Sequence, residues 1–388
     1  MGLQVLDTAL YGIFTLVLGW LLHLIYRWRN PPCNGRLPPG SMGLPVVGET
    51  LQLLKPSPSL DIPDFYKLRL KRYGRLYKTS LMGKPVVVSM DMEFNRFVFR
   101  NNDKLFQLWY PDTMNSLFGK KTVAEGYGSV HRFVRSFAAP AYAPKNLKEA
   151  LVSAMESIIT ESLRTWATKP NIEVKEAMTE MIFGITVNMV IGFESNSLRV
   201  KELRKNFELF FQGLLSFPMY VPGTKFYQSM QGRKYVQKVL KGLLKERIST
   251  PQKRYGDFLD IVAEELRREE ALVDENFMVD LVCGFIFAGI ALTPATLTIG
   301  MKLLTDNPNV VETLTEEHEA ILRKRKEMLN SRITWEEYKS MKFTNQVIFS
   351  LIYLVINEII RVSSNGPGIF RKTLTDVQVN GIYLLLHV

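Results

Sequence analysis

Glu358 and Arg361 stand three positions apart in a segment that is otherwise apolar. Residues at this spacing lie on one face of a helix, so a carboxylate and a guanidinium can pair there. A lone pair of this kind is usually an ordinary surface ion pair of small energy. Within an apolar helix, burial of the pair is costly unless other groups complete its hydrogen bonds. Because the helix is apolar on most faces, the pattern predicts that Glu358 and Arg361 form a buried structural pair, and not a catalytic acid and base.

The chain has two cysteines, Cys33 and Cys283, and their context does not suggest a disulfide framework. Free thiols agree with a cytosolic domain, and Cys283 is interpreted as a small buried hydrophobe. The net charge of +11 accompanies no zinc-ligand spacing and no nucleic-acid motif, so we expect no nucleic-acid partner. The excess positive charge could face anionic lipid headgroups or an acidic partner protein. A solvated surface without a partner explains it equally well.

Four stretches together resemble the cytochrome P-450 superfamily of haem-thiolate monooxygenases: Leu37 to Glu49, Leu105 to Asp112, Thr315 to Ile321 and Asn357 to Lys372. The resemblance runs from the N-terminus to about Gly381 and is closest to plant members that oxidise sterols, brassinosteroids and triterpenoids. It implies a mainly α fold with small β-sheets and a haem cofactor. It also implies a lipophilic small-molecule substrate and electrons that come from NADPH through NADPH-cytochrome reductase.

The resemblance assigns roles to charged residues of this sequence. Glu358 and Arg361 match the ExxR pair of the family. His131 and Arg135 match a helix that contacts the haem propionates, and Arg371 matches a further propionate arginine. Arginine suits this task because its planar guanidinium binds carboxylates through two parallel hydrogen bonds. We therefore expect His131, Arg135 and Arg371 to bind the cofactor.

The axial iron ligand of the family is a cysteine in a Gly-rich loop C-terminal to the ExxR helix, and its thiolate favours O–O cleavage. This sequence departs from the family pattern after Gly381 and has no cysteine after Cys283. Cys33 belongs to a spacer, and His387 is a ligand only in the weakest sense. The chain is therefore expected to be truncated before the haem-binding loop and to lack the metal ligand.

The segment Phe287 to Thr293 matches the family's oxygen-activation motif, which ends in an acid, a threonine and a second hydroxyl residue. Here Ala291 replaces the acid and Leu292 replaces the threonine, so only Thr293 remains. A leucine cannot hydrogen-bond to dioxygen or order a water that delivers a proton. Pro294 removes a helix donor and is expected to bend the helix. No catalytic residue is confirmed by this motif.

Apolar and aromatic residues near these motifs are expected to form a substrate cavity, as a lipid-like substrate requires. The same residues could equally be ordinary core. The candidates are Trp109, Leu117, Phe217, Phe287, Ala288, Ile369 and Phe370.

The segment Ala9 to Tyr26 is almost wholly apolar and is followed by Arg27 and Arg29, with no Lys or Arg before it. Its length is close to the lower limit for a membrane-spanning helix. The positive-inside rule places the rest of the chain in the cytosol. We therefore expect a single-pass anchor in the endoplasmic reticulum membrane, and a buried core helix is the alternative. The expected organisation is an anchor over 1–30, a Pro/Gly-rich spacer over 31–48 and one cytochrome P-450-type domain over 49–388.

The remaining elements follow from periodicity, caps and turn signals. Strand-like runs at Leu76 to Leu81 and Pro85 to Ser89 flank a glycine and predict a hairpin. Helices are predicted over 64–73, 145–168, 173–192, 196–216, 227–249, 257–270, 274–306, 309–325 and 342–362.

Two functions remain open at this point. One is a membrane-bound haem-dependent monooxygenase that oxidises a sterol- or triterpenoid-like substrate with O2, represented by a truncated form that is inactive. The other is a membrane-anchored binding or interaction protein that keeps part of the fold without turnover. The changes at Ala291 and Leu292, together with the missing cysteine loop, favour the second for this chain as written.

Overall fold

The structure is a computed structural model that describes residues 2–33, 35–45, 47–53, 55, 62–81, 83–119, 132–137, 150–194, 197–214, 216, 218–268, 273–325, 333–350, 369–379 and 381–384. The chain divides into two compact units. The first comprises Met1–Trp109 and Arg361–Val388, and the second comprises Tyr110–Ile360. Each unit has its own hydrophobic core.

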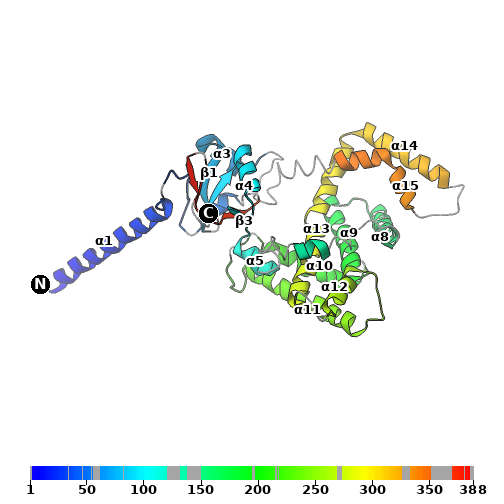
Figure 1. Ribbon diagram of the computed structural model, residues 1–388, viewed down its shortest axis with the longest axis horizontal. Coiled ribbons are helices and arrows are strands. Elements are labelled where there is room, and N and C mark those ends of the chain that lie inside the picture. The colour runs from blue at the N-terminus through cyan, green and yellow to red at the C-terminus, as the bar shows by residue number, and fades with distance from the viewer. Residues whose placement is uncertain are drawn as a thin grey trace. The chain divides into compact units, whose positions relative to one another are not determined.

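The first unit combines short helices with two-stranded antiparallel sheets (Figure 1). The predicted hairpin is confirmed, because β1 pairs with β2 and Leu81 faces Lys84 across a turn in which Gly83 has φ 76°. The elements are α1 Gly2–Arg29, α2 Thr50–Leu53, α3 Asp64–Tyr73, β1 Leu76–Leu81, β2 Lys84–Ser89, α4 Met92–Arg100, β3 Phe106–Leu108, β4 Arg371–Thr373, β5 Val377–Val379 and β6 Ile382–Leu384.

A buried ion pair joins α3 to the hairpin and to Glu49, the residue after the predicted spacer. The Nε of Arg69 donates to Glu49 Oε2 over 2.9 Å, and the Thr79 hydroxyl donates to the same oxygen over 2.6 Å. The Arg69 guanidinium also lies 3.7 Å from the centre of the Phe65 ring. These contacts satisfy a buried charge pair, which would otherwise be costly.

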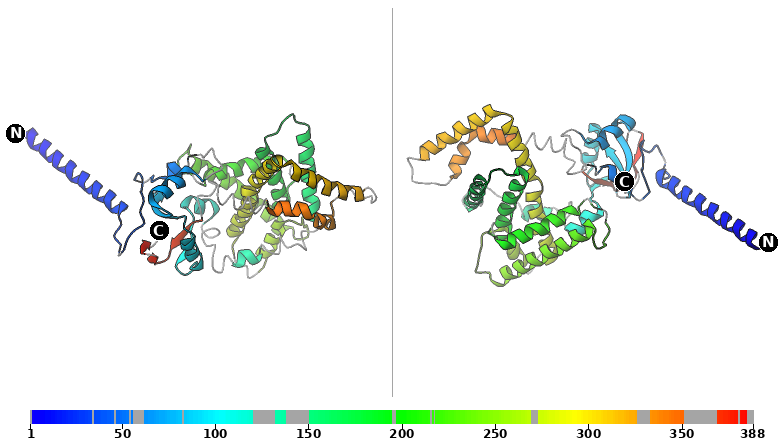
Figure 2. Two further views of the ribbon diagram at one scale, coloured as in Figure 1. Left: turned by 90° about the horizontal axis from the view of Figure 1, so that it is seen from above. Right: turned by 180° about the vertical axis from the view of Figure 1, so that it is seen from behind.

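The second unit is helical, and helices α9 to α13 gather into one bundle in both views of Figure 2. Its elements are α5 Asp112–Phe118, α8 Ala150–Ala167, α9 Val174–Ile191, α10 Leu198–Gln212, α11 Lys225–Ser249, α12 Phe258–Leu266, α13 Glu275–Thr305, α14 Pro308–Arg325 and α15 Trp335–Ser340. Residues 132–137 and 342–350 are also helical.

Side-chain caps fix where several of these helices begin. Asp274 Oδ1 accepts from the backbone N–H of Phe277 over 2.8 Å, and Asp257 caps α12 in the same way. Two predicted helices are too long: α12 ends at Leu266 and α10 ends at Gln212. After the end of α10, Gly213 keeps right-handed helical angles, and a Cβ added there would lie 2.2 Å from Ser229 Oγ. The glycine lets the chain approach α11 closely as the helix ends.

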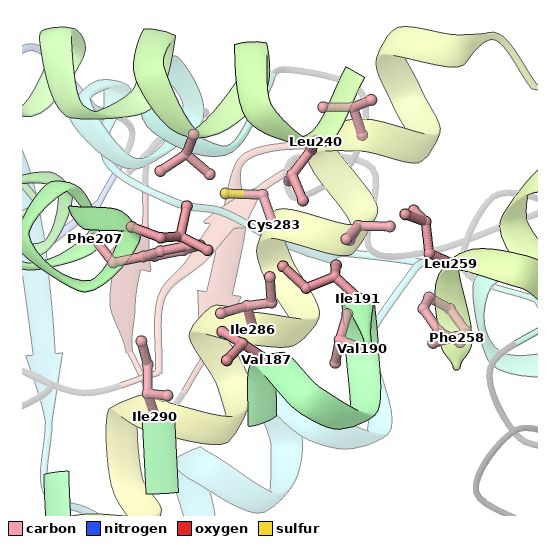
Figure 3. Packing of buried hydrophobic residues seen from close by; sticks show 14 of the residues in the cluster. Val187, Val190, Ile191, Phe207, Leu240, Phe258, Leu259, Cys283, Ile286 and Ile290 are labelled. Atoms are coloured by element: carbon pink, nitrogen blue, oxygen red, sulfur yellow. The ribbon is translucent and has the colours of Figure 1, made fainter. Parts of the chain in front are cut away.

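The core of the second unit centres on α9, whose residues are buried on nearly every side. Val187, Val190 and Ile191 of this helix meet Ile286 and Ile290 of α13 (Figure 3). This explains why α13 is apolar along most of its length. Among the described residues, α13 is also long and apolar enough to cross a membrane, but half of its most apolar window is buried inside the protein. It therefore reads as a core helix.

Helix α1 contrasts with α13. Over 11–26, its large apolar side chains are mostly exposed, and they include Tyr11, Phe14, Leu16 and Trp20. The alternative of a buried core helix at the N-terminus does not fit this exposure. Exposed apolar surface of this extent marks a site that contacts a membrane or another protein.

Candidate functional site

In the first unit, a short sheet brings together candidates that are far apart in the sequence. Strand β3 pairs with β4 so that Leu108 faces Arg371. The backbone N–H of Trp109 then donates to Phe370 O over 3.3 Å. The two rings meet edge to face, with centroids 5.7 Å apart. Trp109 and Phe370 therefore form one aromatic wall, and Ile369 beside them is 70% exposed.

Arg371 lies at the end of this wall with unused hydrogen-bonding capacity. Its Nη1 donates to Phe370 O over 2.9 Å, and its Cζ lies 5.4 Å from the centre of the Phe99 ring. Its Nε is buried and has no hydrogen-bond partner in the described part of the chain. A buried donor without a partner is costly, so an anion that accepted from it would stabilise this site. Arg371 thus fits the carboxylate of a bound cofactor.

In the second unit, the oxygen-activation segment lies on α13, which continues as one helix past Pro294. Ala288, Leu292 and Thr293 are exposed on this helix, and Leu292 is 51% exposed. Ala291 is half-buried. This exposed strip of α13, defined by Ala288, Leu292 and Thr293, is apolar apart from one hydroxyl group. It can contact a lipophilic ligand, but it offers no carboxylate for proton transfer.

The back of the same segment packs closely on α9. A Cβ added at Gly289 would lie 2.9 Å from both Cγ2 and Oγ1 of Thr186. The Thr186 hydroxyl donates to Ile182 O over 2.8 Å, which holds this side chain in place. Gly289 is therefore needed for the close crossing of α9 and α13, and this crossing positions the exposed strip.

An aromatic cluster forms around Phe287, the residue directly before the strip. Phe287 stacks on Phe211 of α10, with ring centroids 4.7 Å apart. It meets Phe118 of α5 edge to face, with ring centroids 4.6 Å apart. Phe118 also contacts Phe210 at 5.1 Å. Sequence reasoning identified Phe287 but missed Phe210 and Phe211 of α10. The candidate Leu117 is fully buried in the core of this unit.

Arg135 lies on the exposed side of the helical segment 132–137. The opposite side of that segment carries Phe133 and Phe137, which contact Phe277 of α13 and Phe258 of α12. This packing leaves the Arg135 side chain available to an anion. Other predicted site residues lie outside the described residues, namely His131, Phe217, Glu358, Arg361 and His387.

The buried Cys283 does not fit an iron ligand. Cys283 is 3% exposed and points into apolar side chains, among them Phe207, Leu240 and Ile286 (Figure 3). Burial raises the pKa of its thiol to about 12, which disfavours the thiolate that iron requires. Cys33 Sγ lies 2.9 Å from Gly35 O in the spacer. The described residues also contain no cluster of His, Cys, Asp and Glu that could hold a metal ion.

The sequence matches the cytochrome P450 family model over residues 38–386. This match covers most of the chain. The protein belongs to the cytochrome P-450 family. Its mainly helical fold with small sheets agrees with the predicted fold class, and members of the family are monooxygenases.

Known relatives place this cytochrome P-450 in the plant triterpenoid and sterol group. It is 47% identical to cytochrome P-450 87A3 of Oryza sativa subsp. japonica, over 93% of this chain and 68% of the rice protein. It is 37% identical to cucurbitadienol 11-hydroxylase of Siraitia grosvenorii, over 96% of this chain and 77% of that enzyme. A solved structure of retinoic acid-bound cyanobacterial CYP120A1 is similar with a TM-score of 0.75 and 26% identity, and the match covers 92% of this chain and 76% of that one.

Proposed function

We propose that this cytochrome P-450 is a membrane-bound haem-dependent monooxygenase that acts on a sterol- or triterpenoid-like substrate, with electrons supplied by NADPH-cytochrome reductase. The observation that carries the proposal is the buried Nε of Arg371, beside the aromatic wall of Trp109 and Phe370, for which the described residues provide no hydrogen-bond partner. A haem propionate supplies the anion that this donor needs. The names of relatives that hydroxylate cucurbitadienol and β-amyrin support the substrate class.

Arg371 would hold a haem propionate, and the family resemblance implies the same task for His131 and Arg135. When bound, haem supplies the oxidising chemistry. The residues that the protein offers to the substrate are mostly apolar. The exposed strip at Ala288 and Leu292 would exclude water and contact a lipophilic ring system. Thr293 is the one hydroxyl group that the strip offers for holding a proton or a water molecule.

We also propose that α1 anchors the protein in the endoplasmic reticulum membrane with the remainder in the cytosol. The exposed apolar side chains of α1 support this, and so do Arg27 and Arg29 in its last turn. Treatment of sealed microsomes with protease should degrade the part of the chain after the anchor. Full protection of that part would place it in the lumen and contradict the proposal.

A second function is favoured by one specific observation. Ala291 and Leu292 stand where the family has an acid and a threonine, so the strip provides no carboxylate for proton delivery. Because Cys283 is buried and Cys33 belongs to the predicted spacer, this 388-residue polypeptide by itself is proposed to be inactive. It would then act as a membrane-anchored protein that binds a lipophilic ligand without turnover.

Haem titration tests the proposed cofactor site. The chain is placed in phosphatidylcholine nanodiscs, and the haem absorbance band is followed as haem is added. Arg371→Ala should weaken binding about tenfold, since it removes one charge-assisted contact of roughly 1.5 kcal/mol. Arg36→Ala removes an exposed arginine from the same unit and should leave the affinity unchanged. Equal affinities for parent and Arg371→Ala would show that Arg371 does not contact haem.

A further inference from the structure

A groove of about 480 Å³ runs along α8, α9 and α10 in the second unit. It contains none of the residues assigned above to haem or to the proposed substrate. Helices α8 and α10 both pack against α9, and the groove lies over the shared helix. Its volume falls within the range of roughly 300–1,000 Å³ that is usual for small-molecule sites. The groove is therefore large enough for a ligand of its own.

The floor of the groove is apolar. Met181 and Phe183 of α9 and Val200 of α10 line it and are almost completely buried by their packing in the core. Ile158 and Trp166 of α8 add half-buried apolar surface on one side. A flat or branched hydrocarbon body would lie against this buried floor and remove the exposed part of Ile158 and Trp166 from water, which is favourable in proportion to the apolar area covered.

The rim of the groove is charged, and part of that charge is already compensated. Arg204 of α10 donates to Glu176 of α9, and its Nε lies 2.9 Å from Glu208 Oε1. Arg204 thus forms ion pairs with two carboxylates of the lining. These acids are consequently not free to bind a cationic ligand.

Basic residues of the rim are not compensated in this way. Lys201 and Lys205 lie one turn apart on α10, on either side of Arg204, and Lys169 follows the end of α8. Within the part of the chain that the structure describes, none of these lysines forms an ion pair. The remaining acids of the lining, Glu161 and Glu180, belong to α8 and α9. The α10 side of the groove is therefore the cationic side.

We propose that this groove is a second ligand site, which binds a small amphipathic anion. Its apolar body would lie on Met181, Phe183 and Trp166, and its carboxylate, sulfate or phosphate group would face Lys201 and Lys205. The ligand could be a soluble anion or the headgroup region of an anionic lipid, because both present the same chemistry. This site is independent of the proposed haem chemistry.

Photo-cross-linking tests the site directly. The full chain in phosphatidylcholine nanodiscs is irradiated with benzophenone-4-carboxylate, and the labelled peptides are located by mass spectrometry. Labels should fall in α8, α9 and α10. Lys201→Glu/Lys205→Glu should raise the concentration for half-maximal labelling about tenfold, since several surface charge interactions of up to ~1 kcal/mol are lost or reversed.

Matched controls separate the site from general effects. Lys238→Glu/Lys245→Glu makes the same charge change at two exposed positions of α11 outside the groove and should leave labelling unchanged. Thr165→Trp fills the groove from an exposed position of α8 and should abolish labelling, with the helical circular dichroism retained. Uncharged 4-methylbenzophenone should label these helices weakly.

The outcomes distinguish the sources and the alternatives. If phosphatidic acid added to the nanodiscs reduces labelling of the groove, the natural ligand is identified as an anionic lipid. If labelling persists, the natural ligand is identified as a soluble anion. Both outcomes support the site. Labels outside the groove would overturn the proposal. It would also be overturned by labelling that is insensitive to Lys201→Glu/Lys205→Glu, or by equal labelling with the uncharged reagent.

Discussion

Arg247 should be among the most costly residues of the second unit to replace. It donates from Nη1 and Nη2 to both carboxylate oxygens of Asp257, over 2.9 and 2.8 Å, and from Nη1 to Asp260 over 2.5 Å. Its side chain is 4% exposed, and that of Asp257 is 3% exposed. The guanidinium also lies 3.5 Å from the centre of the Tyr255 ring. The cluster joins the ends of α9, α11 and α12.

Replacing Arg247 by methionine keeps the apolar stem but leaves Asp257 buried and uncompensated. Removing one partner of a buried pair typically costs about 3–5 kcal/mol. Desolvation already raises the pKa of Asp257, so this carboxylate should be partly protonated once Arg247 is gone. The loss of unfolding free energy should therefore lie at the lower end of that range, about 3 kcal/mol. The free energy of unfolding is to be measured by urea titration, with helical circular dichroism as the signal.

Two comparisons sharpen this test. Arg254→Met breaks an exposed pair with Glu264 at 3.5 Å, whose side chains are 71% and 54% exposed, and it should cost less than about 1 kcal/mol. Adding Asp257→Asn to Arg247→Met removes the stranded charge and should recover part of the lost stability. If Arg247→Met is as stable as the Arg254→Met control, the buried pair does not support this region and the reasoning fails.

Three further predictions concern acid stability, helix packing and the predicted ExxR pair. Hydrogen bonds from Arg325 lower the pKa of Glu337 to about 2. The stability that the ionised Glu337 contributes is therefore fully present above the ordinary pKa of a glutamate and is lost as the pH falls toward 2. Glu337→Gln should flatten the acid-unfolding curve in this range, and an unchanged curve would contradict this. Gly289→Ala should destabilise the protein by about 1–3 kcal/mol in thermal melts, and adding Thr186→Ala should restore much of the loss, because it removes the atoms that the new Cβ would meet at 2.9 Å. Arg361→Ala should lower the yield of folded protein if Arg361 and Glu358 form a buried pair, whereas a mutant as protease-resistant as the parent would indicate an exposed one.

Much of the helical framework was predictable because its signals are local. Asp274 and Asp257 precede apolar repeats and act as N-caps, and α3 and β1 begin and end where the pattern indicated. Helix α4 was missed although a usable signal exists: Asp91 caps it by accepting from the backbone N–H of Phe94 over 2.8 Å. That aspartate before an apolar repeat could have identified the helix.

The site was less predictable because its contacts join distant parts of the chain. Strands β3 and β4 each have three residues, too few for a periodic pattern, and they pair Phe106 with Thr373. The aromatic wall and the environment of Arg371 depend on this pairing. The partner of Phe287 on α10, Phe211, was likewise unpredictable, since phenylalanine in a helix is ordinary core by type alone.

The most direct test is the spectrum of the reduced, carbon-monoxide-bound protein. We propose that this cytochrome P-450 keeps a cofactor contact at Arg371, whereas Cys283 is buried with a raised thiol pKa and Cys33 belongs to the predicted spacer, so that neither is expected to be the iron thiolate. The 388-residue chain should therefore lack the thiolate-type haem band, and a chain with a cysteine-bearing segment grafted after Gly381 should show it. A thiolate-type band from the ungrafted chain would contradict the account.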